Sequence, residues 1–262
     1  MAISIKSGEE VEILREGGGR LAAILASVVH AAKAGIRTSE LSGLAERLIS
    51  SQGGEAIFKG YKIRGAKTPY PAAICASIND EVVHGIPRPE RILQEGDIIG
   101  IDIGMRWPAD GNQGMGLITD MAVTIGIGKI SPEAAHLVRV TREALDMGIA
   151  AVRPGAAIGD IGHAIGGHLK KAGLGVIRDL AGHGVGYELH EDPLIPNYGR
   201  PAGGPELKEG MVLALEPMAT LGDWRIILDP DEWTFRTADR SLAAHFEHTV
   251  AVTKYGGAVL TQ

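Results

Sequence analysis

The chain has 262 residues, of which 45% are hydrophobic and 22% charged, a balance typical of a globular enzyme with a large core. The net charge is −6 and no Lys/Arg run exceeds the pair Lys170–Lys171, so the sequence lacks the basic surface that nucleic-acid binding requires. Cys75 is the only cysteine, which excludes intrachain disulfides and cysteine-based zinc sites.

The N-terminal region predicts a helix and not a targeting or membrane-spanning segment. Residues 1–19 are too polar and acidic for a signal peptide, and the apolar stretch 21–35 is too short to span a bilayer, so we expect a cytoplasmic protein without membrane contact. Ser7 and Glu10 form a capping-box pattern that starts a helix running to about Ala34. Each glycine at 17–19 costs up to ~1 kcal/mol relative to alanine, which predicts a flexible or kinked start.

Further along, short apolar runs bounded by turn residues predict strands. Ser131 followed by Pro132 starts another helix, which ends near Arg153–Gly155. The tract 193–205 is rich in proline and glycine and predicts a loop. The expected strands lie near residues 56–60, 72–78, 97–104, 118–127, 175–181, 211–217 and 245–253.

Short matches between the two halves of the chain indicate an internal repeat. Lys33–Gly35 corresponds to Arg153–Gly155, a shift of 120 residues (153 minus 33). Gly96–Asp102 corresponds to Gly210–Glu216, and the run after Asp120 resembles the run after Glu247. Each half then reads helix, helix, strands, with two acids in its strands. We therefore expect one α+β domain over residues 1–262, with its acids near a pseudo-twofold axis between the halves.

Five side chains of metal-binding type lie inside apolar or glycine-rich runs: Asp102, Asp120, His183, Glu216 and Glu247. Burying a carboxylate costs several kcal/mol unless a cation or a partner compensates it. Unrelated ion pairs are the alternative, but acids from neighbouring strands can converge on one point because alternate side chains share a face. Oxygen-rich ligands with one imidazole suit two Co, Mn, Fe or Zn ions, and such a pair activates water for hydrolysis.

Two further histidines are candidates for holding a substrate amide, with ordinary loop histidines as the alternative reading. His84 precedes a Gly-Ile-Pro turn, and His190 lies seven residues after His183. Asp110 rivals Asp120 as a ligand, but its Asp-Gly-Asn context favours a loop. The remaining histidines are interpreted as structural or surface residues, namely His30, His136, His163, His168, His245 and His248.

At these residues the chain resembles type I methionine aminopeptidases over essentially its whole length. The motifs SINDEVVHGIP, GDIIGIDIG, TDMAVTI, AGHGVGYELHEDP, GMVLALEPM and DRSLAAHFEHT occur in that family's order. The resemblance implies the pita-bread fold and two divalent ions, with Asp120 and Glu247 bridging them. It implies Glu216 as general base or proton shuttle, and His84 and His190 as residues that hold the scissile peptide. It also implies a methionine pocket built from Tyr70, Cys75 and Trp233, with Tyr61 or Phe58 as further candidates.

The same resemblance implies nascent polypeptides with N-terminal methionine as substrates. A monomer is the default expectation, and association with ribosomes, where nascent chains emerge, is a further one. The sequence departs from the family in the long segment Met105–Thr119, which predicts an altered loop near the metal site, in the segment before Cys75, and at Leu189, where an aromatic residue is usual. The chain also shows no N-terminal zinc-binding extension and no type II insertion. Two alternatives stay open, a prolidase-like or X-Pro peptidase of the same fold and a non-catalytic binding protein on this scaffold.

Overall fold

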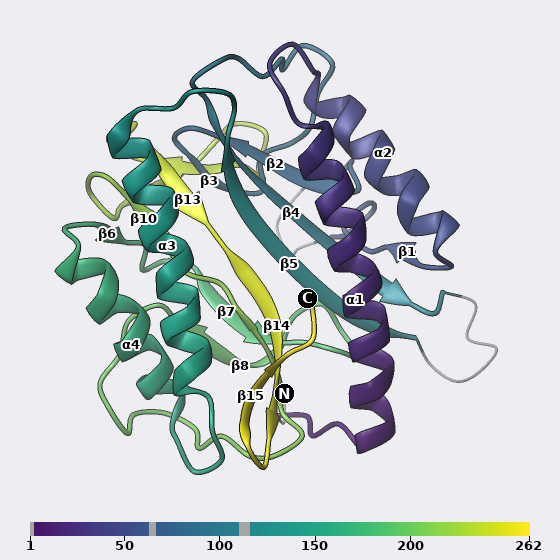
Figure 1. Ribbon diagram of the computed structural model, residues 1–262, viewed down its shortest axis with the longest axis vertical. Helices are drawn as coiled ribbons and strands as arrows, with labels where there is room; N and C mark the ends of the chain where they lie inside the picture. The colour runs from purple at the N-terminus through teal and green to yellow at the C-terminus, as the bar shows by residue number, and fades with distance from the viewer. Residues whose placement is uncertain (1–2, 63–66, 110–115) are drawn as a thin grey trace.

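The computed structural model describes residues 3–62, 67–109 and 116–262. Its four helices lie in two pairs, with strands β5 and β14 running between the pairs (Figure 1). The helices are α1 (Gly8–Ala31), α2 (Thr38–Ser51), α3 (Pro132–Ala151) and α4 (Ile158–Lys171). Among the described residues, no helix is both long and apolar enough to cross a membrane.

Helix α1 begins as its capping box predicts. The Ser7 side chain accepts from the Glu10 amide at 3.3 Å, and the Ser7 amide donates to Glu10 Oε2 at 2.7 Å. The helix ends at Ala31, three residues before the predicted Ala34. Gly35 then adopts a φ of +90°, and its amide donates to the Leu93 carbonyl at 2.8 Å, so the chain turns toward the sheet.

The glycines at 17–19 do not break α1, which is one continuous helix from Gly8 to Ala31. They permit close packing instead. A Cβ added at Gly17 would lie 3.2 Å from Cβ of Trp107, and one added at Gly18 would lie 2.4 Å from the Leu260 carbonyl oxygen. The expected flexible or kinked start is therefore wrong, because tertiary contacts with Trp107 and Leu260 outweigh the low helix propensity of glycine.

The main sheet has nine strands, in the order β1-β4-β5-β14-β9-β7-β8, with β2 also pairing β4 and β15 also pairing β14. Two three-stranded sheets, β13-β10-β6 and β11-β12-β3, complete the fold. The strands are β1 (Glu55–Ala56), β2 (Ile74–Ile78), β3 (Glu81–Val83), β4 (Ile98–Trp107), β5 (Leu117–Gly126), β6 (Gly175–Val176), β7 (Ala181–Gly184), β8 (Glu191–Pro196), β9 (Val212–Leu215), β10 (Met218–Thr220), β11 (Ile226–Leu228), β12 (Phe235–Thr237), β13 (Ala243–His245), β14 (Glu247–Thr253) and β15 (Gly256–Val259).

Two strand predictions and one loop prediction need correction. The run at 175–181 is split between β6 and β7, and the run at 56–60 overlaps the two-residue strand β1 only at Ala56. The first residues of the predicted loop 193–205 belong to β8. Proline is tolerated there because β8 lies at the edge of the sheet, where a missing amide breaks no inner ladder.

The internal repeat is visible in the structure. Helix α4 starts 120 residues after α2 (158 minus 38) and ends 120 residues after it (171 minus 51). The glycines that follow α1 and α3 share the same left-handed conformation, with φ of +90° at Gly35 and +82° at Gly155. The prediction of two similar halves is confirmed in the helices and the strands that follow them, and the prediction of a single domain over 1–262 stays a prediction.

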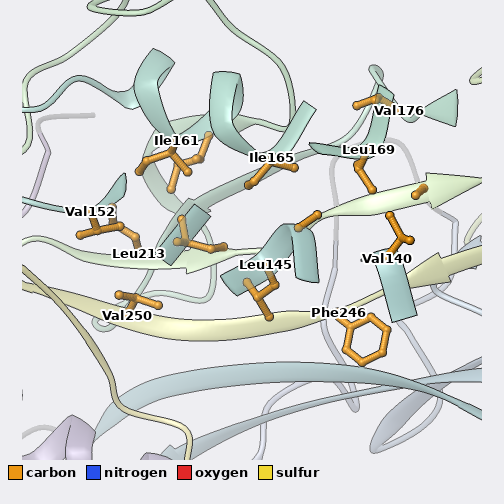
Figure 2. Packing of buried hydrophobic residues seen from close by; sticks show 14 of the residues in the cluster. Val140, Leu145, Val152, Ile161, Ile165, Leu169, Val176, Leu213, Phe246 and Val250 are labelled. Carbon is orange, nitrogen blue, oxygen red and sulfur yellow. The ribbon is translucent and has the colours of Figure 1, made fainter. Parts of the chain in front are cut away.

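The helices cover one face of the main sheet, and this leaves the other face for the site. In the N-terminal half, Ile101 and Ile103 of β4 pack with Leu21 and Leu25 of α1. In the C-terminal half, the strand residues Leu213 and Val250 pack with residues of α3 and α4, among them Leu145 and Ile161 (Figure 2). Because side chains alternate along a strand, residues between these apolar positions point away from the helices.

Candidate metal centre

The N-terminal half supplies two aspartates from one long hairpin. Asp102 lies between Ile101 and Ile103 on β4, so it faces away from the helices. In the strand register, Asp102 lies opposite Ala122 of β5, and Ala122 lies opposite Glu247 of β14. Asp120 is two residues before Ala122 and shares its face. The prediction that acids from neighbouring strands converge on one face is met by this register.

The C-terminal half supplies its residues from strand ends. His183 of β7 lies opposite Ala214 of β9, and Glu216 comes two residues after Ala214, directly beyond the last residue of β9. Glu247 is the first residue of β14. The register therefore brings His183, Glu216 and Glu247 to the same face as the two aspartates.

The His183 side chain is held as a metal ligand would be. Its Nδ1 lies 2.9 Å from the Gly184 carbonyl oxygen, and because a carbonyl only accepts, this nitrogen carries the proton. Nε2 therefore presents a lone pair. It lies 3.6 Å from both Asp120 Oδ2 and Glu216 Oε1, beyond ordinary hydrogen-bond distance. Ligand atoms from Asp120, His183 and Glu247 all lie within 4.8 Å of one another.

Two threonine side chains bond β5 of the N-terminal half to residues 245–249 of the C-terminal half, beside these acids. The Thr249 hydroxyl lies 3.0 Å from the Asp120 amide and 3.1 Å from Asp120 Oδ1. On the other side of the Ala122–Glu247 pair, Thr124 Oγ1 accepts from the His245 amide at 2.9 Å and lies 2.8 Å from the His245 carbonyl oxygen. The two hydroxyls take the place of backbone–backbone hydrogen bonds between β5 and residues 245–249. They therefore hold the backbones of the two halves together beside the acids.

Burial makes the acids unfavourable as free anions. It raises the pKa of Asp102, Asp120 and Glu216 to about 7, and repulsion from neighbouring carboxylates adds to the rise for the two aspartates. Burial likewise raises the pKa of Glu247 well above its usual range. Asp102 Oδ1 is buried without a hydrogen-bond partner among the described residues. Clustered acids, one unpartnered oxygen and an imidazole lone pair fit divalent cations.

His245, which the sequence analysis interpreted as structural or surface, lies in this site. It is only 3% exposed, and its Nε2 is 3.3 Å from Glu216 Oε2. Its neighbour Phe246 packs in the helix-side core, so His245 and Glu247 share the site face on either side of it. The signal was available in the sequence, since residues two apart in a strand share a face. His248 contacts Thr261 through Nδ1 at 2.9 Å.

His84 borders the same pocket from the end of β3. It adopts a φ of +59°, in the left-handed region that is uncommon outside glycine but is enriched in asparagine, aspartate and histidine. The Thr234 hydroxyl lies 3.4 Å from the His84 carbonyl oxygen, and the Phe235 ring lies 6.0 Å from the His84 ring. Burial lowers the pKa of His84 to about 4, so its imidazole is neutral at pH 7.

His190 borders the pocket beside His183, with 4.4 Å between the two ring centroids. The Tyr61 hydroxyl lies 2.6 Å from His190 Nδ1. Burial lowers the pKa of His190 to about 3, and the nearby His183 contributes to that shift. Both extra histidines are therefore neutral groups that can donate or accept hydrogen bonds within the pocket.

The pocket wall beside the acids is aromatic and apolar. Tyr70 and Trp233 meet edge to face with 5.2 Å between their ring centroids, and Trp233 Nε1 donates to the Thr68 carbonyl at 3.2 Å. Cys75 lies opposite Asp102 in the pairing of β2 with β4. The pocket is lined by all the predicted residues of this wall, namely Tyr70, Cys75, Trp233, Tyr61 and Phe58, together with Leu189.

At both of its described ends, the segment Met105–Thr119 continues the β4–β5 hairpin. Met105 pairs with Thr119 and Trp107 pairs with Leu117. Trp107 is five residues from Asp102, so the described end of the hairpin lies about 16 Å from that acid. This part of the expected loop therefore points away from the acids. The rival ligand Asp110 lies outside the described residues.

Comparison with known proteins gives a consistent result. The model of metallopeptidase family M24 matches residues 12–254. The chain is 44% identical to a methionine aminopeptidase of Clostridium acetobutylicum, covering 99% of this chain and 98% of that protein. It is 42% identical to the methionine aminopeptidase of Aquifex aeolicus, with all of both chains covered.

Solved structures agree with the sequence comparison. The crystal structure of a methionine aminopeptidase from Thermotoga maritima matches with a TM-score of 0.93 and 41% identity, covering 100% of both chains. A prolidase from Pyrococcus furiosus matches with a TM-score of 0.72 and 24% identity, covering 98% of this chain and 65% of that chain. The prolidase likeness concerns the fold alone, and the predicted α+β pita-bread fold is confirmed.

Proposed function

Because this chain belongs to metallopeptidase family M24 and is similar to bacterial methionine aminopeptidases over its whole length, we infer that it removes N-terminal methionine from peptides and proteins. It is a metallo-exopeptidase. The observation that carries this function is the full-length likeness, at 44% and 42% identity, to two proteins named for that activity. Prolidases share the fold at 24% identity or less, so an X-Pro specificity has weaker support.

We propose that the centre holds two divalent ions, Co, Mn, Fe or Zn, through Asp102, Asp120, His183, Glu216 and Glu247. The support is the convergence of these side chains on one face and the cost of leaving four buried acids without a cation. Asp120 and Glu247 belong to the compact donor group with His183, which supports a bridging role for both. When bound, such ions lower the pKa of water and polarise a peptide carbonyl.

We propose Glu216 as the general base or proton shuttle, because its carboxylate borders the pocket among the other buried acids. His84 and His190 are proposed to hold the scissile peptide and to stabilise the charge that develops on its oxygen. Their neutral imidazoles suit that task, since a neutral ring can donate one hydrogen bond without adding net charge to the pocket.

The methionine side chain is proposed to bind against Tyr70, Cys75 and Trp233. An apolar wall with two aromatic rings suits a flexible thioether, and Phe58 and Tyr61 extend this wall. A small second residue is proposed as the further requirement, because that residue has to pass the part of the pocket that His84 borders. Met-Ala peptides should then be cleaved and Met-Phe peptides should resist.

The test measures methionine release from Met-Ala-Ser by metal-stripped protein after Mn or Co is added. An X-Pro dipeptide and creatine serve as alternative substrates. Methionine release that depends on added metal supports the function, and cleavage confined to the X-Pro dipeptide overturns it. Equal rates on Met-Ala and Met-Phe peptides would show that the second-residue requirement is absent while leaving methionine removal intact.

Peptides and proteins with N-terminal methionine are the substrates that the activity implies. We propose that they include nascent polypeptides at the ribosome, and that the chain acts in the cytoplasm as a monomer. Size-exclusion chromatography with light scattering tests the oligomeric state, and co-sedimentation with ribosomes tests the association. A dimer, or protein found only in the ribosome-free fraction, would overturn the corresponding statement.

A further inference from the structure

Glu216 lies between two imidazoles, one at each carboxylate oxygen. His183 Nε2 is 3.6 Å from Oε1, and His245 Nε2 is 3.3 Å from Oε2. The two rings differ in what they present. His183 uses its Nδ1 proton on the Gly184 carbonyl and presents a lone pair, as a ligand must. His245 Nε2 has no hydrogen-bond partner among the described residues, so Oε2 is the acceptor within its reach.

The backbone of His245 is tied in place on both sides. Its amide donates to Thr124 Oγ1 at 2.9 Å, which anchors it to β5. In the pairing of β10 with β13, His245 lies opposite Met218, two residues after Glu216. The Phe246 amide donates to the Pro217 carbonyl at 3.3 Å, so the strand of His245 is bonded to the corner that carries Glu216. The imidazole and the carboxylate are therefore set against each other by the fold.

We propose that His245 is a positioning residue for Glu216, donating its Nε2 hydrogen to Oε2 so that Oε1 stays directed at the centre beside His183. The acceptor-only carboxylate and the buried, otherwise unpartnered nitrogen are complementary, and a small ring rotation completes the bond. A donor of this kind restricts the rotation of a ligand carboxylate, and removing such a partner costs metal affinity without removing a ligand. The inference rests on the proposed metal centre.

The test titrates metal-stripped full-length protein with Mn²⁺ alone by calorimetry, and then measures kcat and KM on Met-Ala-Ser. His245→Leu removes the donor at similar volume. His245→Asn keeps a polar amide that is too short to reach Glu216, and it serves where the leucine variant does not fold. His245→Gln places an N–H at about the same reach as Nε2 and should restore function. His248→Leu and His248→Gln are matched controls nearby on the opposite face.

With the leucine and asparagine variants we expect the wild-type number of bound ions, a Kd weaker by about tenfold or more at one site, and a lower kcat. The glutamine variant and both His248 controls should stay close to wild type. Wild-type affinity in both the leucine and asparagine variants would overturn the inference. Loss of one ion in the leucine, asparagine and glutamine variants would also overturn it, because His245 would then be a ligand. Wild-type protein that binds no Mn²⁺ would instead overturn the metal centre itself.

Discussion

The two halves of the molecule share the same arrangement of helices and strands, but the lengths of their strands and the side chains that they place at the site differ. Helices α2 and α4 repeat with identical spacing, and each half ends in an antiparallel strand pair, β4 with β5 and β9 with β14. In the N-terminal half these strands are ten residues each, and both acids lie within them. In the C-terminal half β9 has four residues, and Glu216 and Glu247 lie at strand ends.

The two halves also differ in the side chains that they supply: the N-terminal half supplies Asp102 and Asp120, and the C-terminal half supplies Glu216 and Glu247. The C-terminal half also supplies the imidazoles beside the acids, His183 and His245. A repeated scaffold can therefore carry a site whose two sides have different chemistry.

Removing one acid from each half has the largest expected effect. Asp102→Ala and Glu216→Ala should each abolish turnover and reduce bound metal while the fold survives, because the proposed centre takes ligands from both halves. Activity on Met-Ala-Ser, metal content by mass spectrometry and circular dichroism measure these three effects. Full activity in either variant would refute its assignment as a ligand.

A buried ion pair between the two halves can be compared with an exposed ion pair inside the N-terminal half. Lys6, whose side chain is fully buried, lies 2.6 Å from Glu191 of the C-terminal half, and Ser4 also contacts this carboxylate. Lys6→Met leaves Glu191 largely buried without its cation and should cost about 3–5 kcal/mol of unfolding free energy. Lys59 lies 2.6 Å from Glu46 in the N-terminal half, but both side chains are about half exposed. Lys59→Met should therefore cost at most about 1 kcal/mol.

Urea unfolding of both variants measures the contrast. Equal losses in Lys6→Met and Lys59→Met would show that the buried link adds nothing beyond a surface ion pair.

Each half also contributes one histidine that is proposed to hold the substrate, His84 in the N-terminal half and His190 in the C-terminal half. His84→Ala and His190→Ala should keep metal content near wild type and lower the rate constant by about 10²-fold or more. Steady-state kinetics and metal analysis on the same preparations measure both. If His190→Ala loses an ion, that residue is a ligand and the roles of His183 and His190 need exchanging.

A smaller effect concerns pH and involves acids of both halves. Burial raises the pKa of Asp102, Asp120 and Glu216 to about 7, so these acids are largely protonated at pH 6 in metal-free protein. Metal binding requires their ionised forms and must release protons. The apparent affinity for Mn²⁺ should therefore rise between pH 6 and 8, by about tenfold in total for each of these acids that must lose its proton.

Calorimetry in buffers of different ionisation enthalpy measures the protons released. An affinity that is constant from pH 6 to 8, with no proton release, would contradict the raised pKa values.

Local sequence was sufficient to predict the starts of α1 and α3, the repeat, and the acids that lie on one face. Ser7 and Glu10 carry their own cap, and the helix start at Ser131 is equally local, since its side chain accepts from the Ala134 amide. The glycines and the proline that follow the helices revealed the internal repeat, with its shift of 120 residues. The acids could be identified because a carboxylate inside an apolar strand requires a reason to be buried, and the alternation of side chains placed them on one face.

The contacts that each of these residues makes with distant parts of the chain are visible only in the tertiary structure. The glycines of α1 are explained by Trp107 and Leu260, which are far away in sequence and approach too closely for side chains. The prolines of β8 are compatible with a strand because that strand lies at the sheet edge. His245 became part of the site because the β10–β13 pairing sets it against Glu216. Local sequence states what a residue can do, but its partner is set by which strands meet, and that depends on long-range packing.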